Sequence, residues 1–117
     1  QDYGAPDFLH GPLAVVQPGF DVLAVVAAGP TEAAVLEVAE RTRGLGARVT
    51  IISDGPVDRS ACDAIADIHL HLGTGISEPL STIPFAVAGQ LIALHLALAV
   101  GLSPDTPRSL SKVTVTR

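Results

Sequence analysis

The chain has 117 residues, which is the size of one small domain. Hydrophobic residues make up 48% of it and charged residues 16%, which excludes the class of intrinsically disordered chains and predicts a packed core. Twelve acidic and seven basic side chains give a formal net charge of −5. No net positive field attracts a phosphate backbone, so we expect no nucleic-acid partner.

Cysteine usage and the chain start bear on where the protein works. The single cysteine, Cys62, excludes an internal disulfide and a thiolate metal cluster, and suits a reducing cytoplasm. The start lacks the basic and apolar regions of a signal peptide, and the apolar stretch 83–102 is interrupted by proline, glycine, glutamine and histidine residues. We therefore expect no export signal and no membrane span. Because the chain begins at Gln1 and contains no methionine, we expect it to be a processed or excised piece of a longer chain.

The first half of the chain predicts a parallel βαβ unit. Residues 21–28, DVLAVVAA, are apolar without a break after Asp21, which is typical of a strand buried on both faces, and Gly29-Pro30 ends the run. Thr31 can cap a helix over 31–45 with Gly44 near its end. Residues 47–53 read as the next strand, and this succession indicates an α/β fold with a parallel sheet.

The second half predicts a short helix over 59–66, an alternating edge strand over 67–72 and a long helix over roughly 80–100. That helix is apolar almost all round, so we expect it to be buried, and Gly101 is placed to end it. About three strands are fewer than sheets usually hold, so we expect a domain over 1–101 that is incomplete at its N-terminal side. Residues 102–117 read as an extended tail.

His10 is the first candidate for chemistry. It stands in His10-Gly11-Pro12, where Pro12 can open a short helix over 13–16. A histidine at a helix N-terminus stays neutral and can accept a proton near physiological pH. The alternative is a capping or surface histidine.

Lys112, the only lysine, is the second candidate. A partly desolvated lysine amine can form a Schiff base with a sugar carbonyl or polarise it. The alternative is a solvated lysine in the tail.

The other histidines, Cys62 and Glu78 do not enter the proposed site. His69 and His71 share one face of a strand, but nothing completes a metal site, so we expect exposed edge residues and no metal. His95 is expected in a core or an interface, Cys62 as a small buried hydrophobe, and Glu78 as a carboxylate at a helix start.

Two segments carry a resemblance to a known family. They are DFLHGPLAVVQPGFDVLAVVA at 7–27 and TIPFAVAGQLIALHLALAVGLSPDTPRSLSKVTVTR at 82–117. With the intervening βαβ unit they resemble the sugar isomerase (SIS) family over nearly the whole chain. The match is to the second half of the second SIS module in glucosamine-6-phosphate synthases and in SIS-type glucosamine-6-phosphate deaminases. The fold that the resemblance implies is a three-layer, flavodoxin-like parallel sheet.

The resemblance implies roles for three residues. His10 would assist opening of the sugar ring in the site of a neighbouring subunit, Lys112 would contact the carbonyl or form the imine, and Ser111 would line the pocket. The family's glutamate base and phosphate-binding loop lie upstream of this segment, and Gln1 stands where many relatives carry glutamate. The implied assembly is a homodimer with shared sites, and no cofactor is implied.

The resemblance leaves the function open between classes. The leading expectation is an isomerase or deaminase that interconverts fructose 6-phosphate and glucosamine 6-phosphate, present here as part of a longer enzyme and inactive alone. One alternative is a non-catalytic SIS sensor that binds sugar phosphate. Another is the isomerase domain of a glutamine-dependent synthase, and the tail SKVTVTR mildly favours the glutaminase-free branch.

Overall fold

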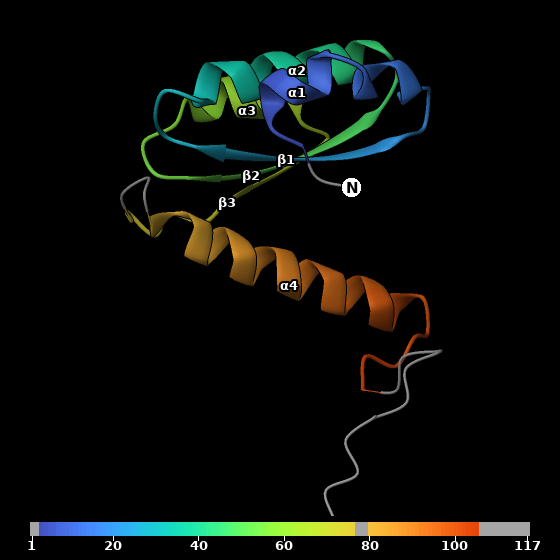
Figure 1. Cartoon of the computed structure of the whole chain (residues 1–117). Helices are drawn as coiled ribbons and strands as arrows, with labels where there is room; N and C mark the ends of the chain where they lie inside the picture. Colours follow the sequence, from blue (N-terminus) through green and yellow to red (C-terminus); the bar gives the residue numbers. More distant parts are fainter. Residues whose placement is uncertain (1–2, 77–79, 106–117) are drawn as a thin grey trace, which may run out of the picture. The chain divides into compact units, whose positions relative to one another are not determined.

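A computed structural model describes residues 3–76 and 80–105 as an alternation of helices and strands (Figure 1). The elements are α1 (Ala5–Leu9), the 3₁₀ helix η1 (Pro12–Val15), β1 (Asp21–Ala27), α2 (Glu32–Gly44), β2 (Arg48–Asp54), α3 (Arg59–Ile65), β3 (Ile68–His71) and α4 (Thr82–Ala99). The chain divides into two compact units, 1–85 and 86–117, and the division falls within α4.

The sheet of the first unit is parallel throughout, with the strand order β1-β2-β3. Asp21 pairs with Arg48 at one end of the β1–β2 ladder and Ala27 pairs with Asp54 at the other. The β2–β3 ladder is shorter and ends where Ser53 pairs with His71. The predicted α/β class and the predicted edge strand are therefore confirmed.

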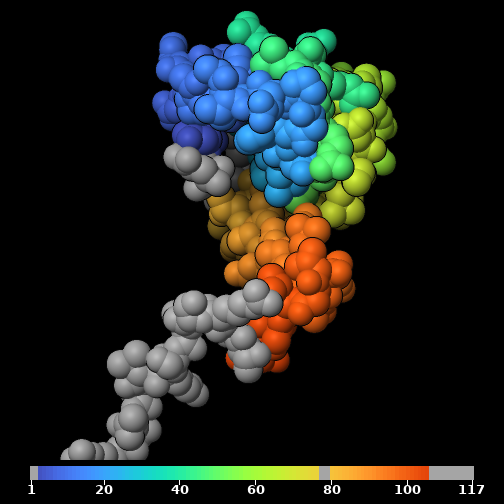
Figure 2. Space-filling model, turned by 90° about the vertical axis from the view of Figure 1, so that its right-hand side faces the viewer, coloured from blue at the N-terminus to red at the C-terminus, as the bar shows by residue number. Residues whose placement is uncertain are grey.

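The helices α1, α2 and α3 lie on one side of the sheet. Both α1 and α3 contact α2, and Figure 2 shows the blue N-terminal segment packed against the green α2 in one continuous surface. Beneath these helices lies a core of fully or almost fully buried side chains: Val26, Ala39, Val49, Ile51, Val57 and Cys62. Burying each large aliphatic side chain there contributes about 1.5–3 kcal/mol.

Local chemistry explains where the helices of this unit end. α2 has Thr31 at its N-cap, but the threonine side chain makes no capping hydrogen bond, so that predicted role is wrong. Gly46, with φ +87°, adopts the left-handed conformation that ends the helix and turns the chain into β2. α3 is capped by Asp58, whose carboxylate accepts from the N–H of Ala61.

The alternate residues of β1 and β3 have exposed apolar side chains. Leu23 is 50% exposed and Val25 is 42% exposed. In β3, Ile68 and Leu70 are exposed as well. The prediction that the first strand is buried on both faces is therefore wrong for this chain, because β1 is an edge strand whose second face keeps contact with solvent.

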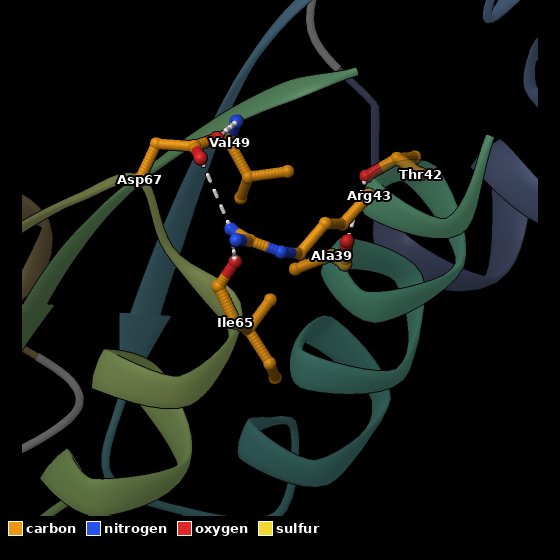
Figure 3. Close-up of polar contacts among 6 residues, drawn as sticks. All are labelled: Ala39, Thr42, Arg43, Val49, Ile65 and Asp67. Carbon is orange, nitrogen blue, oxygen red and sulfur yellow. Dashed lines mark hydrogen bonds and ion pairs between the residues drawn. The ribbon is translucent and has the colours of Figure 1, made fainter. Parts of the chain in front are cut away.

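A polar cluster around Asp67 ties α2, β2 and the segment before β3 together (Figure 3). The Val49 N–H donates to Asp67 Oδ2 over 2.7 Å, and the Arg43 guanidinium donates to Asp67 Oδ1 over 3.2 Å and to the Ile65 carbonyl. The Thr42 hydroxyl donates to the Ala39 carbonyl within α2. Asp67 thus satisfies a buried backbone N–H at the start of the central strand.

Helix α4 has 18 residues and ends near Gly101, whose φ of +75° is the expected stop. Pro84 lies in its first turn, where its missing N–H costs no intrahelical bond. Only Ala88 is buried, so the prediction of a buried helix is wrong for this chain. By length and hydropathy α4 is also long and apolar enough to cross a membrane, a property that it shares with core helices of soluble proteins and with signal sequences.

Candidate active site

The carboxyl end of β2 carries the most buried charged side chain of the described residues, Asp54, which is 2% exposed. Its Oδ1 accepts from the backbone N–H groups of Gly55 and Thr74, and its Oδ2 accepts from the Thr74 hydroxyl. The hydrogen bond from the Thr74 hydroxyl is the main reason why the pKa of the Asp54 carboxyl lies below its ordinary value. Burial acts in the opposite direction and raises that pKa. Asp54 is therefore an anion that anchors the 73–76 segment.

A second polar group lies one residue earlier on β2. The hydroxyl of Ser53, which is fully buried, lies 2.7 Å from His69 Nε2 and 2.9 Å from His71 Nδ1. His69 Nδ1 lies 2.5 Å from Asp63 Oδ1 on α3. The side chains of α3, β2 and β3 thus form one hydrogen-bonded chain.

These groups lie where α/β proteins bind ligands. In open parallel sheets, ligands bind outside the carboxyl ends of the strands. Asp54 ends β2, His71 ends β3, and Gly73 and Gly75 flank Thr74 with φ of +65° and +67°. A turn of this kind brings backbone N–H groups close to the strand ends.

The sequence predictions for His69 and His71 need correction. Both side chains are partly buried and hydrogen-bonded, and the side chain of His69 is only 7% exposed, so they are not exposed edge residues. The physical reason is register, because the pairing of Ser53 with His71 turns both imidazoles toward the Ser53 hydroxyl. Among the described residues no group of three or more candidate ligands could hold a metal ion.

His10 lies at the junction of two short helices. It is the C-cap of α1, where its backbone N–H donates to the Asp7 carbonyl, and it precedes Gly11, the N-cap of η1. The predicted helix opened by Pro12 exists as this 3₁₀ helix. The His10 side chain is exposed and has no hydrogen bond or ion pair to the residues that the structure describes.

Three other sequence candidates fall outside the described ranges 3–76 and 80–105: Ser111, Lys112 and Glu78. The predicted proximity of His10 and Lys112 is therefore not tested by the structure. Cys62 is fully buried, as predicted, and burial raises the pKa of its thiol, with the charges of Glu32, Asp58 and Asp63 adding to the effect. His95 is exposed on α4 and so is not a core residue of this chain.

An apolar pocket of about 500 Å³ lies beside the edge strand β1. α1 contributes Phe8 to its wall, β1 contributes Val22 and Ala24, and α2 contributes Val35 and Ala39. Of its described lining residues only Tyr3 and Asp21 carry polar side chains, whereas sites for small polar ligands orient them with several convergent polar groups. The carboxyl end of β2 and β3 is the better candidate.

Sequence reasoning missed Ser53, Asp54 and Thr74. The available signal was local, because Ser53-Asp54 follows the apolar run of β2 and Thr74 stands between two glycines after the next strand. Polar residues directly after buried parallel strands are candidates for the ligand edge of the sheet.

The chain is similar over nearly its whole length to part of several curated proteins. It is 34% identical over 98% of its length to a glutamine–fructose-6-phosphate aminotransferase (isomerizing) of Methanothermobacter thermautotrophicus. To the proteins of the same name from Aeropyrum pernix and Pyrococcus horikoshii it is 35% and 37% identical over 97% and 95% of its length. No protein-family model matches the chain.

The chain spans about a fifth of the length of these relatives, namely 19% of the first and 18% of the other two. Identities of 34–37% over 95–98% of the chain show that it is homologous to one segment of these proteins. The predicted resemblance is confirmed, and the partial sheet is consistent with part of an SIS-like fold.

Proposed function

We propose that this chain forms part of an aminosugar-phosphate isomerase or deaminase that interconverts fructose 6-phosphate and glucosamine 6-phosphate. The observation that supports the proposal best is the homology, which includes both motif-bearing ends and covers 98% of the chain in the first relative. The reaction moves a proton between C1 and C2 of the sugar. It needs a ring opener, a carboxylate base, and a cation or imine that stabilises the enediol or enamine.

In this proposal His10 opens the sugar ring and Lys112 contacts the carbonyl or forms the imine. The exposed imidazole of His10, free of side-chain partners among the described residues, is available to a ligand from outside its own fold. Ser111 lines the same pocket. The carboxylate base comes from a segment other than the described residues of this chain.

We also propose that two copies of the chain associate in the cytoplasm. α4 exposes large apolar side chains around its surface, with Ile83 at 61%, Leu91 at 51% and Leu98 at 54%. Leaving them in water forfeits about 25 cal/mol for each Å² that a partner would cover. A two-fold mate provides that cover and brings His10 to a neighbouring site. Sedimentation of a monomer at micromolar concentration would contradict this part of the proposal.

The function is tested with the complete protein that contains this chain. Glucosamine 6-phosphate turnover is measured in one direction, and in the other fructose 6-phosphate is supplied with either ammonia or glutamine. We expect turnover in the parent and a loss of about 100-fold or more in His10→Asn, because general acid–base groups contribute about 10²–10⁴-fold. Activity with glutamine identifies a synthase, and activity with ammonia alone identifies the glutaminase-free branch.

Lys112→Arg separates the imine role from a purely electrostatic one. Arginine keeps the positive charge but cannot form an imine, so we expect sugar-phosphate binding to persist while turnover is lost. Glu40→Gln is the matched control, because Glu40 is exposed on α2 and has no partner among the described residues. Binding of sugar phosphate without turnover in the parent would make the chain a sensor module and the roles of His10 and Lys112 wrong.

A further inference from the structure

We propose that Asp63, His69, Ser53 and His71 form a proton relay whose outer end is His71 Nε2. The relay takes up a proton there from water or from a hydroxyl-bearing solute, and the positive charge comes to rest on His69. The inference assigns acid–base chemistry to a cluster that the proposed isomerase function does not use, and it does not depend on that function.

Geometry carries the proposal. Three consecutive contacts join the four groups: 2.5 Å from Asp63 Oδ1 to His69 Nδ1, 2.7 Å from His69 Nε2 to Ser53 Oγ, and 2.9 Å from Ser53 Oγ to His71 Nδ1. The two contacts of the Ser53 hydroxyl lie in the normal range for hydrogen bonds that join nitrogen and oxygen, and the contact between Asp63 and His69 is shorter than that range. Ser53 is fully buried, so water does not compete for its hydroxyl, whereas the side chain of Asp63 is 65% exposed.

When both imidazoles are neutral, counting donors and acceptors gives a single arrangement of protons in the proposed relay. The Asp63 carboxylate only accepts, so His69 Nδ1 carries a proton and donates it. In neutral His69 the other nitrogen, Nε2, is then an acceptor, and the Ser53 hydroxyl donates to it. The Ser53 oxygen in turn accepts from His71 Nδ1–H. His71 Nε2 is left unprotonated, as a proton acceptor.

Protonation at this outer nitrogen moves charge through the cluster. When His71 Nε2 gains a proton, the proton on its Nδ1 passes to Ser53 Oγ, and the Ser53 proton passes to His69 Nε2. One N–H bond forms at each imidazole, one breaks at His71, and the serine ends as a neutral hydroxyl. The added charge is then on His69, which is in direct contact with the Asp63 carboxylate.

The outer end of the relay is open to small molecules at the strand ends. His71 is partly exposed, and a Cβ placed on Gly73 would lie 3.9 Å from its Nε2, so the missing side chain leaves that approach free. The anionic Asp54 also acts electrostatically on His71. Asp54 accepts hydrogen bonds from Thr74 and Gly55, whereas Asp63 contacts His69 directly, so the proposal places the charge on His69.

Nitrogen-detected NMR of the whole chain tests the relay, with His10 and His95 as internal references. In the neutral state we expect His69 and His71 both to be protonated at Nδ1. On acidification the first proton should change both rings together: His69 gains its second N–H, and His71 exchanges Nδ1–H for Nε2–H without becoming charged. Independent changes in the two rings, or a first charge on His71, would overturn the proposal.

Two substitutions break the relay at different points. Ser53→Ala removes the bridging hydroxyl, so His71 should keep one tautomer until it is itself charged. Because Ser53 is buried and its loss could unfold the chain, Asp63→Ala at an exposed position is the second variant; there the first charge should no longer settle on His69. Glu40→Ala, an equal charge change elsewhere, should leave the coupled change intact. Coupling that survives in both Ser53→Ala and Asp63→Ala would refute the relay.

Discussion

Asp67 allows a test of whether an ion pair or a satisfied backbone group stabilises the junction of α2 and β2. Asp67 Oδ2 accepts from the N–H of Val49, which is fully buried, while its Oδ1 pairs with Arg43. An unsatisfied buried N–H costs about 1–3 kcal/mol. The side chains of the ion pair are 42% and 46% exposed, and pairs this exposed contribute about 1 kcal/mol or less.

The two terms separate in a pair of substitutions. Asp67→Ala removes both and should lower the free energy of unfolding by about 2–3 kcal/mol. Asp67→Asn keeps a carbonyl oxygen for Val49 and loses only the charge, so its cost should be about 1 kcal/mol or less. In thermal unfolding, Asp67→Ala should then lower the Tm by about 8–24 °C, since 1 kcal/mol corresponds to about 4–8 °C in a small domain.

Circular dichroism with urea and heat provides the assay, and Asp21→Asn is the matched control. Asp21 pairs with Arg48 at 2.8 Å, and the two side chains are 74% and 69% exposed. Within 3–76 and 80–105, no buried backbone N–H donates to the Asp21 carboxylate. That control should change stability by less than about 0.5 kcal/mol. If Asp67→Asn costs as much as Asp67→Ala, the charge and not the acceptor stabilises the junction, and the reasoning is wrong.

Three further predictions concern acid stability, backbone conformation and thiol reactivity. The folded-state pKa of Asp54 is lowered, so ionised Asp54 stabilises the fold fully above its unfolded pKa of about 4. This stabilisation is lost as the pH falls through the lower folded-state pKa. Thr74→Val removes the main cause of the lowered pKa, so acid unfolding should begin at higher pH. Gly46→Ala should lower the free energy of unfolding in urea by about 1–3 kcal/mol, because φ is +87° and a Cβ would lie 3.1 Å from Pro18 Cα. Gly44→Ala is the control, because a Cβ there meets open space within α2 and should leave stability unchanged or raise it. Cys62, buried with a raised pKa, should react with a disulfide reagent only as fast as the protein opens; reaction in the native state within the mixing time would contradict this.

Element type and approximate bounds followed from local patterns. The predicted strand 47–53 is β2 at Arg48–Asp54, and the predicted helix 59–66 is α3 at Arg59–Ile65. Both rest on apolar runs bounded by Gly, Pro or capping residues, which act over a few neighbouring residues. The long helix predicted over about 80–100 is α4 at Thr82–Ala99, and Gly101 follows its end in the expected left-handed conformation.

Burial was predicted less well, because it depends on what lies beside an element. An unbroken apolar run predicts a strand covered on both faces, yet β1 is the edge of a three-stranded sheet and keeps Leu23 half exposed. The apolar composition of α4 likewise predicts burial, but only Ala88 is buried in it. In both cases the apolar composition indicates that the surface is more stable when it is covered. It does not indicate whether this chain contains the element that covers it.

The α/β class, the order of the elements, and the candidates His10 and Lys112 all followed from the amino-acid sequence, as did the resemblance at the two ends of the chain. Only the tertiary structure brought Asp63, His69, Ser53 and His71 into one hydrogen-bonded chain. Ser53 is separated from the two histidines by 16 and 18 residues, and their contact depends on the parallel register that pairs Ser53 with His71. A shift of one residue would turn these side chains to opposite faces of the sheet, and local patterns do not encode which residue pairs with which.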